Sequence, residues 1–446
     1  MKIQSRRAVI VLFLLGFFIF GIVFFVSSYL KNASTWVFYS GNKHIYKNGR
    51  ISTGTIYDRN GLTLFSTEGG KVKYNSDKTI RTAVMHTVGD SEGNVSTGAL
   101  YAFKKQLSGW NLVNGVYHGN GSGNAISLTI DAKLCAVAYE ALAGRHGTVG
   151  VYNYKTGDIL CMVSTPSFDP ENPPKVDPDS EEHNGIYMNR LLSSTYTPGS
   201  VFKLVTLAAA IDNISGVTDR TFRCNGTLKI DGGKVTCPSS HGKQNLSEAL
   251  ANSCNTAFAE LAIEAGANQL QAYAQKAGFN SVMYIDGIKT AQGKVDVTAA
   301  SKTDLGWAGI GQYTDTANPA TFMAYMGAIA NNGVRVTPKL LLNSKSKQTS
   351  VLSPDTADKI KTYMRNDTIL NYGERNYPGL HLCAKSGTAQ INGQQPNAWF
   401  AGFLDRKDCP LAFVVVVENG GAGSKVSGPI AGKVLQEAVK TYAGKM

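Results

Sequence analysis

The strongest constraint on this chain is an uncharged run of 23 residues near its N-terminus, Ala8–Leu30. At about 1.5 Å of rise per residue, a helix of this length crosses a hydrocarbon core of about 30 Å with some tilt. Lys2, Arg6 and Arg7 precede the run, and this positive charge predicts a cytoplasmic N-terminus. A cleaved signal peptide is the alternative, but the run is longer than a typical signal-peptide core and no convincing small-x-small site follows it. We therefore expect everything after the run to lie outside the cytoplasm.

The composition allows two or three domains with a large core, because 43% of the 446 residues are hydrophobic and 17% are charged. The net charge of +12 suits an anionic partner such as a membrane surface or an anionic polymer. The positive charge is not gathered into a basic arm with interleaved aromatics, so we do not expect nucleic-acid binding. The chain contains no Walker phosphate loop and no Gly-x-Gly-x-x-Gly after a strand.

Seven cysteines are an odd number for an exported chain, so at least one is free unless it pairs between chains. Cys224 and Cys237, 13 residues apart in a glycine-rich segment, are the best candidates for a disulfide. No Cys-x-x-Cys or His-x-x-x-His pair supports zinc, so the sequence predicts neither a metal site nor a cofactor.

Patterning divides the chain into four expected parts. They are a cytoplasmic tail, a membrane anchor, a small β-rich irregular module, and one large globular domain, at 1–7, 8–30, 31–125 and 126–446. The large domain opens with a short strand that leads through Asp131 into an amphipathic helix.

Two hairpins are expected in the large domain, one with its turn at residues 155–158 and one in "AWFAGFLDRKDCPLAFVVVVEN" near the C-terminus. Helical patterns fill the middle, and a last helix is expected from about Pro429 to Tyr442. Strands at both ends with helices between them predict an α/β domain of the α+β type, with one antiparallel sheet covered by helices.

The segment "TYTPGSVFKLVTLAAAID", which begins at Thr195, places Ser200 three residues before Lys203. The residues after Ser200 are apolar almost all round, which predicts a buried helix with both side chains on its first turn. Burial and the helix N-terminus both lower a lysine pKa, and a neutral lysine is the base that a serine nucleophile needs. In the alternative reading, Ser200 only caps the helix and Lys203 reaches out to solvent.

Ser-x-x-Lys occurs five times in the chain, beginning at Ser28, Ser40, Ser200, Ser240 and Ser344. The first of these ends the membrane run, and three others lie in polar, turn-rich sequence without a buried helix to desolvate the lysine. Only the pair at Ser200 has the context that the chemistry requires.

A second motif, Ser253-Cys254-Asn255, follows within "LANSCNTAFAE". A second hydroxyl can relay protons, and an asparagine amide can hold both a lysine and a substrate amide because it donates and accepts. The motif is weak alone, since Ser122-Gly-Asn also matches it and a helix cap explains it equally well. Cys254 is interpreted as a small buried apolar residue.

The third motif is Lys385-Ser386-Gly387-Thr388, in a run that is typical of a strand. Alternation on a strand places Lys385 and Gly387 on one side and the two hydroxyls on the other, so both sides contribute only if the strand edges a cleft. Gly387 allows close approach of a ligand, and a backbone N–H here with that of Ser200 forms a candidate oxyanion hole. The sequence Lys155-Thr156-Gly157 also fits the motif, but it lies at a predicted turn.

The ordered motifs Ser200-x-x-Lys203, Ser253-Cys254-Asn255 and Lys385-Ser386-Gly387-Thr388 resemble those of penicillin-binding proteins and class A β-lactamases. The segments "LTIDAKL", "TGDILCMVSTPSFDPENPP", "GIGQYTDTANPATFMAYMGAIANNGVRVTP" and "AWFAGF" resemble the transpeptidase domain of class B penicillin-binding proteins. "GTIYDRNGLTL" resembles the start of that class's N-terminal pedestal, which is short here. The resemblance covers most of residues 50–446 and implies the β-lactamase/transpeptidase fold.

The resemblance also implies site roles. Ser200 attacks the D-Ala-D-Ala carbonyl of a peptidoglycan stem peptide, with Lys203 as base and Ser253 relaying a proton to the leaving group. Asn255 holds the peptide amide, the backbone amides of Ser200 and Thr388 form the oxyanion hole, and the terminal carboxylate is held by Lys385, Ser386 and Thr388. β-Lactams are expected to acylate the same serine. Ser386 stands where threonine is commoner, but the hydroxyl is kept.

Several alternatives remain. A β-lactamase of class A needs a Glu-x-x-Leu-Asn before the third motif, and none stands between Asn255 and Lys385. A D,D-carboxypeptidase usually carries its anchor at the C-terminus, whereas the apolar run here is at the N-terminus. A non-catalytic β-lactam sensor or scaffold does not need intact motifs, and all the motif residues are intact in this chain. No glycosyltransferase sequence precedes the domain, so the resemblance implies a SEDS-type glycan polymerase as partner in the cell membrane.

Overall fold

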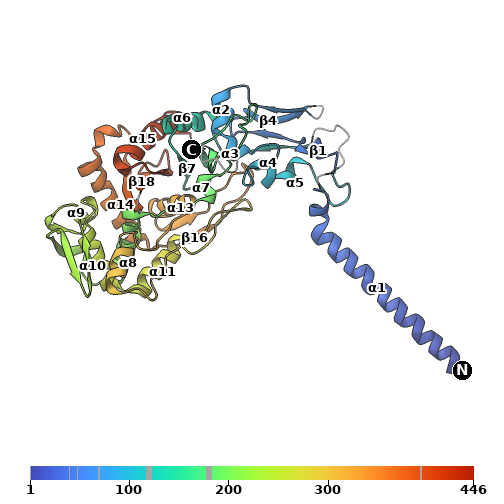
Figure 1. Cartoon of the computed structure of the whole chain (residues 1–446), viewed down its shortest axis with the longest axis horizontal. Helices are drawn as coiled ribbons and strands as arrows, with labels where there is room; N and C mark the ends of the chain where they lie inside the picture. The colour runs from blue at the N-terminus through green and yellow to red at the C-terminus, as the bar shows by residue number, and fades with distance from the viewer. Residues whose placement is uncertain are drawn as a thin grey trace.

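The computed structural model describes residues 2–39, 41–47, 49–68, 71–116, 123–176, 183–391 and 394–445 (Figure 1). Ser40 and Ser122, which belong to two of the chance motif matches, lie outside these ranges. Helix α1 (Lys2–Trp36) is exposed along most of its length and points away from the rest of the chain (Figure 1). An 18-residue window within Gln4–Trp36 has a mean hydropathy of 3.2 with none of it buried, so the expected apolar helix is present and continues beyond its predicted end.

A four-stranded sheet follows α1, with strand order β5-β4-β3-β6. Its strands are β3 (Thr55–Tyr57), β4 (Thr63–Glu68), β5 (Lys71–Tyr74) and β6 (Ala125–Ser127). β3 and β6 pair in parallel, and the other pairs are antiparallel. A separate hairpin precedes the sheet, formed by β1 (Tyr46–Lys47) and β2 (Arg50–Ile51).

This part of the chain is less purely β than the sequence suggests. Among the described residues between β5 and β6 there are four short helices, namely α2 (Lys78–Ala83), α3 (Met85–Val88), α4 (Ala99–Ala102) and α5 (Lys104–Leu107). The expected boundary at residue 125 falls inside β6, because that strand completes the smaller sheet by pairing with β3.

The larger sheet is antiparallel and has five strands in the order β17-β18-β19-β7-β8. The strands are β7 (Gly147–Asn153), β8 (Ile159–Thr165), β17 (Leu382–Ile391), β18 (Gln394–Leu404) and β19 (Leu411–Val417). Both predicted hairpins are confirmed, as β7–β8 and β18–β19. β7, β8 and β19 are buried at every residue, because helices cover both faces of the sheet. β17 is an edge strand.

Helices α6 (Ala132–Leu142) and α15 (Gly423–Tyr442) pack together on one face of this sheet, and α13 (Pro319–Ala330) and α7 (Arg190–Ser193) lie on the other (Figure 1). Asp131 caps α6 as predicted, since its side chain accepts from the N–H groups of Lys133 and Leu134. The last helix begins before the predicted Pro429, which lies inside α15 instead of starting it.

A mainly helical region lies beyond α13. It contains the 3₁₀ turn η2 (Gly199–Phe202) and helices α8 (Lys203–Asn213), α9 (Leu246–Ala251), α10 (Asn255–Ala265), α11 (Ala267–Ala277), α12 (Lys302–Ala308) and α14 (Pro354–Asp367), followed by the π-turn η4 (Thr368–Tyr372). Residues 203–210 of α8 are all buried, which confirms the helix predicted after Ser200.

Eight short strands in and around the helical region form four antiparallel pairs. β9 (Thr221–Cys224) pairs with β12 (Gly242–Asn245), and β10 (Thr227–Ile230) pairs with β11 (Gly233–Thr236). The remaining pairs are β13 (Tyr284–Ile285) with β14 (Ile288–Lys289), and β15 (Val334–Val336) with β16 (Gln348–Ser350). Two further 3₁₀ turns are η3 (Val217–Asp219) and η5 (Glu374–Asn376).

Candidate active site

Ser200 lies in the turn η2, directly before α8, where the chain runs against the edge strand β17. Gly199 has φ of +57°, and a Cβ there would lie 3.1 Å from the carbonyl oxygen of Thr388. On the other side, a Cβ at Gly387 would lie 2.8 Å from the carbonyl oxygen of Pro198. The two glycines therefore let the serine turn and β17 pack backbone against backbone.

Lys203 is fully buried and points its ammonium group at the first two motifs together. Its Nζ lies 3.1 Å from Oγ of Ser200 and 3.2 Å from Oγ of Ser253. It also donates to the Ser253 carbonyl at 2.5 Å and to Oδ1 of Asn255 at 2.8 Å. Ser253 reaches this position with φ of +49°, which is unusual for a residue with a side chain.

Burial lowers the pKa of Lys203 from 10.5 to about 7, and the positive charge of Lys385 acts in the same direction. The Cys237 and Cys254 thiols and the Asp367 carboxyl oppose this shift. A pKa near 7 means that a large fraction of Lys203 is neutral at physiological pH, as the sequence analysis expected for a base.

Lys385 lies on β17, where its ammonium group contacts two residues that the sequence did not indicate, Asp367 and Tyr372. Its Nζ is 3.3 Å from Oδ2 of Asp367 and 3.4 Å from the hydroxyl of Tyr372. Burial alone would lower the pKa of Lys385, but Asp367 and Tyr372 outweigh burial and raise it, so this lysine is charged. Lys203 and Lys385 thus have opposite protonation preferences.

Tyr372 also orients the neighbouring strand residue. Its hydroxyl donates to Oγ of Ser386 at 3.0 Å and accepts from the N–H of Ser386 at 2.8 Å. Burial raises the pKa of Tyr372 to about 12, so the phenol stays protonated and able to donate. No sequence motif indicates Tyr372 or Asp367. Asp367 is the last residue of α14 and Tyr372 is the last residue of η4, and both reach the site only through packing.

A cleft of about 560 Å³ joins the three motifs. Its lining includes five of the eight predicted site residues, Ser200, Ser253, Asn255, Ser386 and Thr388. The two lysines are buried behind them, and Gly387 packs against the serine turn. The expected alternation along β17 is confirmed, since the two hydroxyl residues face the cleft while their neighbours do not.

The chance motif matches lie elsewhere. Lys155-Thr156-Gly157 forms the turn between β7 and β8, where Nζ of Lys155 donates to Oδ1 of Asn331 at 2.7 Å. Ser28 lies in α1, and Ser240 and Ser344 lie in loops. Burial of the lysine, not the motif itself, separates Ser200 from these pairs.

The predicted disulfide between Cys224 and Cys237 is not formed, and all seven cysteines are free. Instead, Sγ of Cys237 lies 3.8 Å from Sγ of Cys254, which follows Ser253. The β10–β11 hairpin carries Cys237 to the start of α10, where the backbone N–H of Asn255 donates to its sulfur at 3.0 Å. Cys254 is buried as expected, but it has polar neighbours.

Comparison with known proteins gives a consistent result. Residues 147–436 match the family model described as penicillin binding protein transpeptidase domain. The peptidoglycan D,D-transpeptidase PbpA of Mycobacterium tuberculosis is 27% identical over 361 residues, covering 71% of this chain and 73% of that protein. Stage V sporulation protein D of Bacillus subtilis is 29% identical over 358 residues, covering 71% of this chain and 54% of that protein.

Solved structures show the same likeness. The imipenem acyl-enzyme complex of penicillin-binding protein A from M. tuberculosis superposes with a TM-score of 0.76 at 25% identity, over 87% of this chain and 98% of that one.

Proposed function

This chain belongs to the penicillin-binding protein transpeptidase family, and on that premise we propose that Ser200 is the acylated nucleophile of a peptidoglycan D,D-transpeptidase. The observation that carries the proposal is the position of Lys203. This fully buried lysine has its Nζ within 3.2 Å of the hydroxyls of both Ser200 and Ser253. Its lowered pKa makes the neutral amine available as a base.

In the acylation step, Lys203 takes the proton of Ser200 as Oγ attacks the penultimate D-Ala carbonyl. A neutral lysine has two N–H bonds and one lone pair. The Ser253 carbonyl and Oδ1 of Asn255 accept the two N–H bonds, at 2.5 and 2.8 Å, which leaves the lone pair for the serine proton. The backbone N–H groups of Ser200 and Thr388 stabilise the oxyanion, a role supported by the close packing of η2 against β17.

Collapse of the tetrahedral intermediate breaks the peptide bond, and the departing D-Ala nitrogen takes a proton relayed from Lys203 through the Ser253 hydroxyl. An amine from a second stem peptide then attacks the ester, and its proton returns to Ser200 through the same groups. The product is a new peptide cross-link with the enzyme regenerated. A β-lactam would form the same ester but keep its leaving group attached.

The remaining motif residues bind the donor peptide. The charged Lys385 lies beneath Ser386 and Thr388, so the two hydroxyls and the positive charge favour the terminal carboxylate. Asn255 donates one Nδ2 hydrogen to the Thr236 carbonyl at 2.8 Å, which leaves its second hydrogen for a substrate carbonyl.

We place α1 across the cell membrane with the N-terminus in the cytoplasm and the catalytic part outside. The uncovered apolar surface of α1 and the positive charges before it support this orientation. The family resemblance adds a SEDS-type glycan polymerase as the membrane partner that supplies the strands to be cross-linked.

Mass mapping of a penicillin adduct tests the nucleophile. We expect one adduct on the peptide that contains Ser200, its loss in Ser200→Ala, and full retention in the matched control Ser240→Ala, which removes another serine of a Ser-x-x-Lys pair. An adduct that persists in Ser200→Ala would refute the assignment.

A donor pentapeptide offered together with a D-amino acid separates transfer from trimming. A transpeptidase gives an exchange product whose yield rises with acceptor concentration. Release of D-Ala without exchange would instead identify a D,D-carboxypeptidase.

A further inference from the structure

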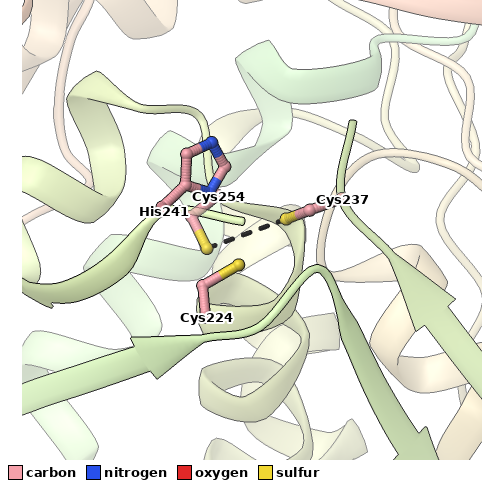
Figure 2. Close-up of side chains that lie close together, drawn as sticks. All are labelled: Cys224, Cys237, His241 and Cys254. Carbon is pink, nitrogen blue, oxygen red and sulfur yellow. Dashed lines mark hydrogen bonds between the residues drawn. The ribbon is translucent and has the colours of Figure 1, made fainter. Parts of the chain in front are cut away.

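Three cysteines and a histidine converge at the cleft, and the proposed chemistry uses none of them. The four residues are Cys224, Cys237, His241 and Cys254, and one ligand atom from each lies within 4.8 Å of all the others (Figure 2). They come from separate places in the fold: the end of β9, the segment after β11, the residue before β12, and the residue before α10. Figure 2 shows the three sulfur atoms near one another, below the imidazole ring.

The spacing of these atoms suits a tetrahedral metal better than a disulfide. Sγ of Cys237 and Sγ of Cys254 are 3.8 Å apart. A disulfide needs about 2.05 Å between sulfurs. A zinc ion with Zn–S bonds of about 2.3 Å holds two sulfurs about 3.8 Å apart, the edge of its tetrahedron. All four ligand atoms lie within 4.8 Å of one another, which exceeds that edge by no more than about 1 Å, and side-chain rotation can close this difference.

The sulfur of Cys237 lies among backbone hydrogen-bond donors. Backbone N–H groups at the start of α10 donate to Sγ of Cys237, from Asn255 at 3.0 Å and from Thr256 at 3.4 Å. A helix N-terminus and N–H donors favour the negative sulfur that binds a metal.

His241 completes the donor set with a nitrogen that has no other task in the described part of the chain. Its Nδ1 is buried and makes no hydrogen bond of acceptable geometry, whereas Nε2 lies 3.3 Å from Oγ of Ser239. One free ring nitrogen, with the other held by a neighbour, is the usual arrangement of a metal-binding histidine.

We propose that Cys224, Cys237, His241 and Cys254 bind one Zn²⁺ ion. Three sulfurs and one imidazole in tetrahedral reach select zinc over hard cations such as Mg²⁺ or Ca²⁺. The sequence predicted no metal site, because the ligands are 13, 4 and 13 residues apart and contain no Cys-x-x-Cys pair. Strand pairing, not sequence proximity, brings them together.

The ion has a structural consequence for the cleft. Cys254 lies between Ser253 and Asn255, the two residues that hold Lys203, and Ser253 has φ of +49°. Cys237 and His241 line the cleft itself. A bound zinc would therefore link the second motif to the β9–β12 strand pair and hold Ser253 in its left-handed conformation. In this proposal the four ligands position the site and take no part in the chemical steps.

Metal analysis of the full chain, purified in detergent without chelator, tests the proposal. We expect about one zinc ion per chain, bound equally by Ser200→Ala, so that the result does not depend on the proposed catalysis. Loss of an outer-shell partner alone costs about 10- to 100-fold in metal affinity, so His241→Ala should weaken zinc binding by more than about 100-fold. His241 is partly exposed, so its removal is compatible with folding. Cys409→Ala, which removes a buried cysteine outside the cluster, is the matched control.

Cobalt substitution reports the ligand set directly. Co²⁺ in the wild-type site should give intense visible bands of tetrahedral thiolate coordination, and Cys237→Ser should shift and weaken them. Removing zinc should slow penicillin acylation of the wild type, and returning zinc should restore it. Zinc content below about 0.1 per chain, or a disulfide joining any two of the three cysteines in the native protein, would overturn the proposal.

Discussion

Lowering the pH through 7 should switch off acylation by protonating Lys203. Burial and the charge of Lys385 lower the pKa of this lysine from 10.5 to about 7. That change corresponds to about 5 kcal/mol against the charged form, at about 1.4 kcal/mol per pH unit. The group is fully buried, so the penalty is not screened by solvent.

The expected size of the effect follows from the neutral fraction. With a pKa of about 7, about 90% of Lys203 is neutral at pH 8 and about 10% at pH 6. The rate of acylation by a chromogenic or fluorescent penicillin should therefore fall about tenfold between these values and level off above pH 8. An unperturbed lysine would instead give a rate that rises about tenfold per pH unit as far as pH 10.

Stopped-flow measurement on the full chain in detergent provides the profile. Return of each sample to pH 8 should restore the rate, which separates titration from unfolding. Lys203→Arg should be inactive at every pH, because arginine does not lose its proton in proteins. A rate that still climbs tenfold per unit above pH 8 would refute a neutral Lys203 as the base.

Two further predictions concern the scaffold. A Cβ at Gly311, where φ is +74°, would lie 2.1 Å from the carbonyl oxygen of Gly199, whereas Gly216, with φ of +68°, has nothing within 4 Å. Alanine at either glycine should cost about 1–2 kcal/mol of stability from the left-handed backbone. Gly311→Ala should cost more than Gly216→Ala because its Cβ meets a backbone carbonyl, and only Gly311→Ala should also slow penicillin acylation. Equal acylation rates in the two variants would contradict this reasoning. Separately, Lys385→Met leaves Asp367 buried without its cation and should lower the free energy of unfolding by about 3–5 kcal/mol. The double variant with Asp367→Leu should recover most of this loss in denaturant titrations, and failure to recover would show that charge pairing is not the cause.

Local pattern was sufficient to predict the elements that carry the motifs. The apolar helix after Ser200, the strand at Lys385 and both hairpins follow from periodicity and turn residues, and the structure has all of them. For the last helix, the sequence predicts a start that is too late, because a proline normally marks a helix start and Pro429 instead lies inside α15.

Long-range packing set the limit of prediction. Asp367 ends α14, which packs on β17 and thereby brings a carboxylate under Lys385. The spacing of the cysteines does not indicate their cluster, because two strand pairings and the start of α10 bring Cys224, Cys237 and Cys254 together. In both cases the partners are distant in sequence, and no short motif records their meeting.

In the proposed topology, α1 joins the catalytic part to the membrane as one continuous helix and not as a flexible tether. Its 35 residues span about 52 Å, which exceeds a hydrocarbon core of about 30 Å by about 20 Å. Near the end of α1, Ala33 is buried, and the Tyr29 hydroxyl donates to the Leu112 carbonyl at 3.2 Å. The last turns of the helix therefore contact the module that follows. Each residue added to such a helix would move the catalytic part about 1.5 Å along the helix axis and rotate it by about 100° around that axis. In that topology, α1 would set the height of the cleft above the bilayer and the direction in which the cleft faces.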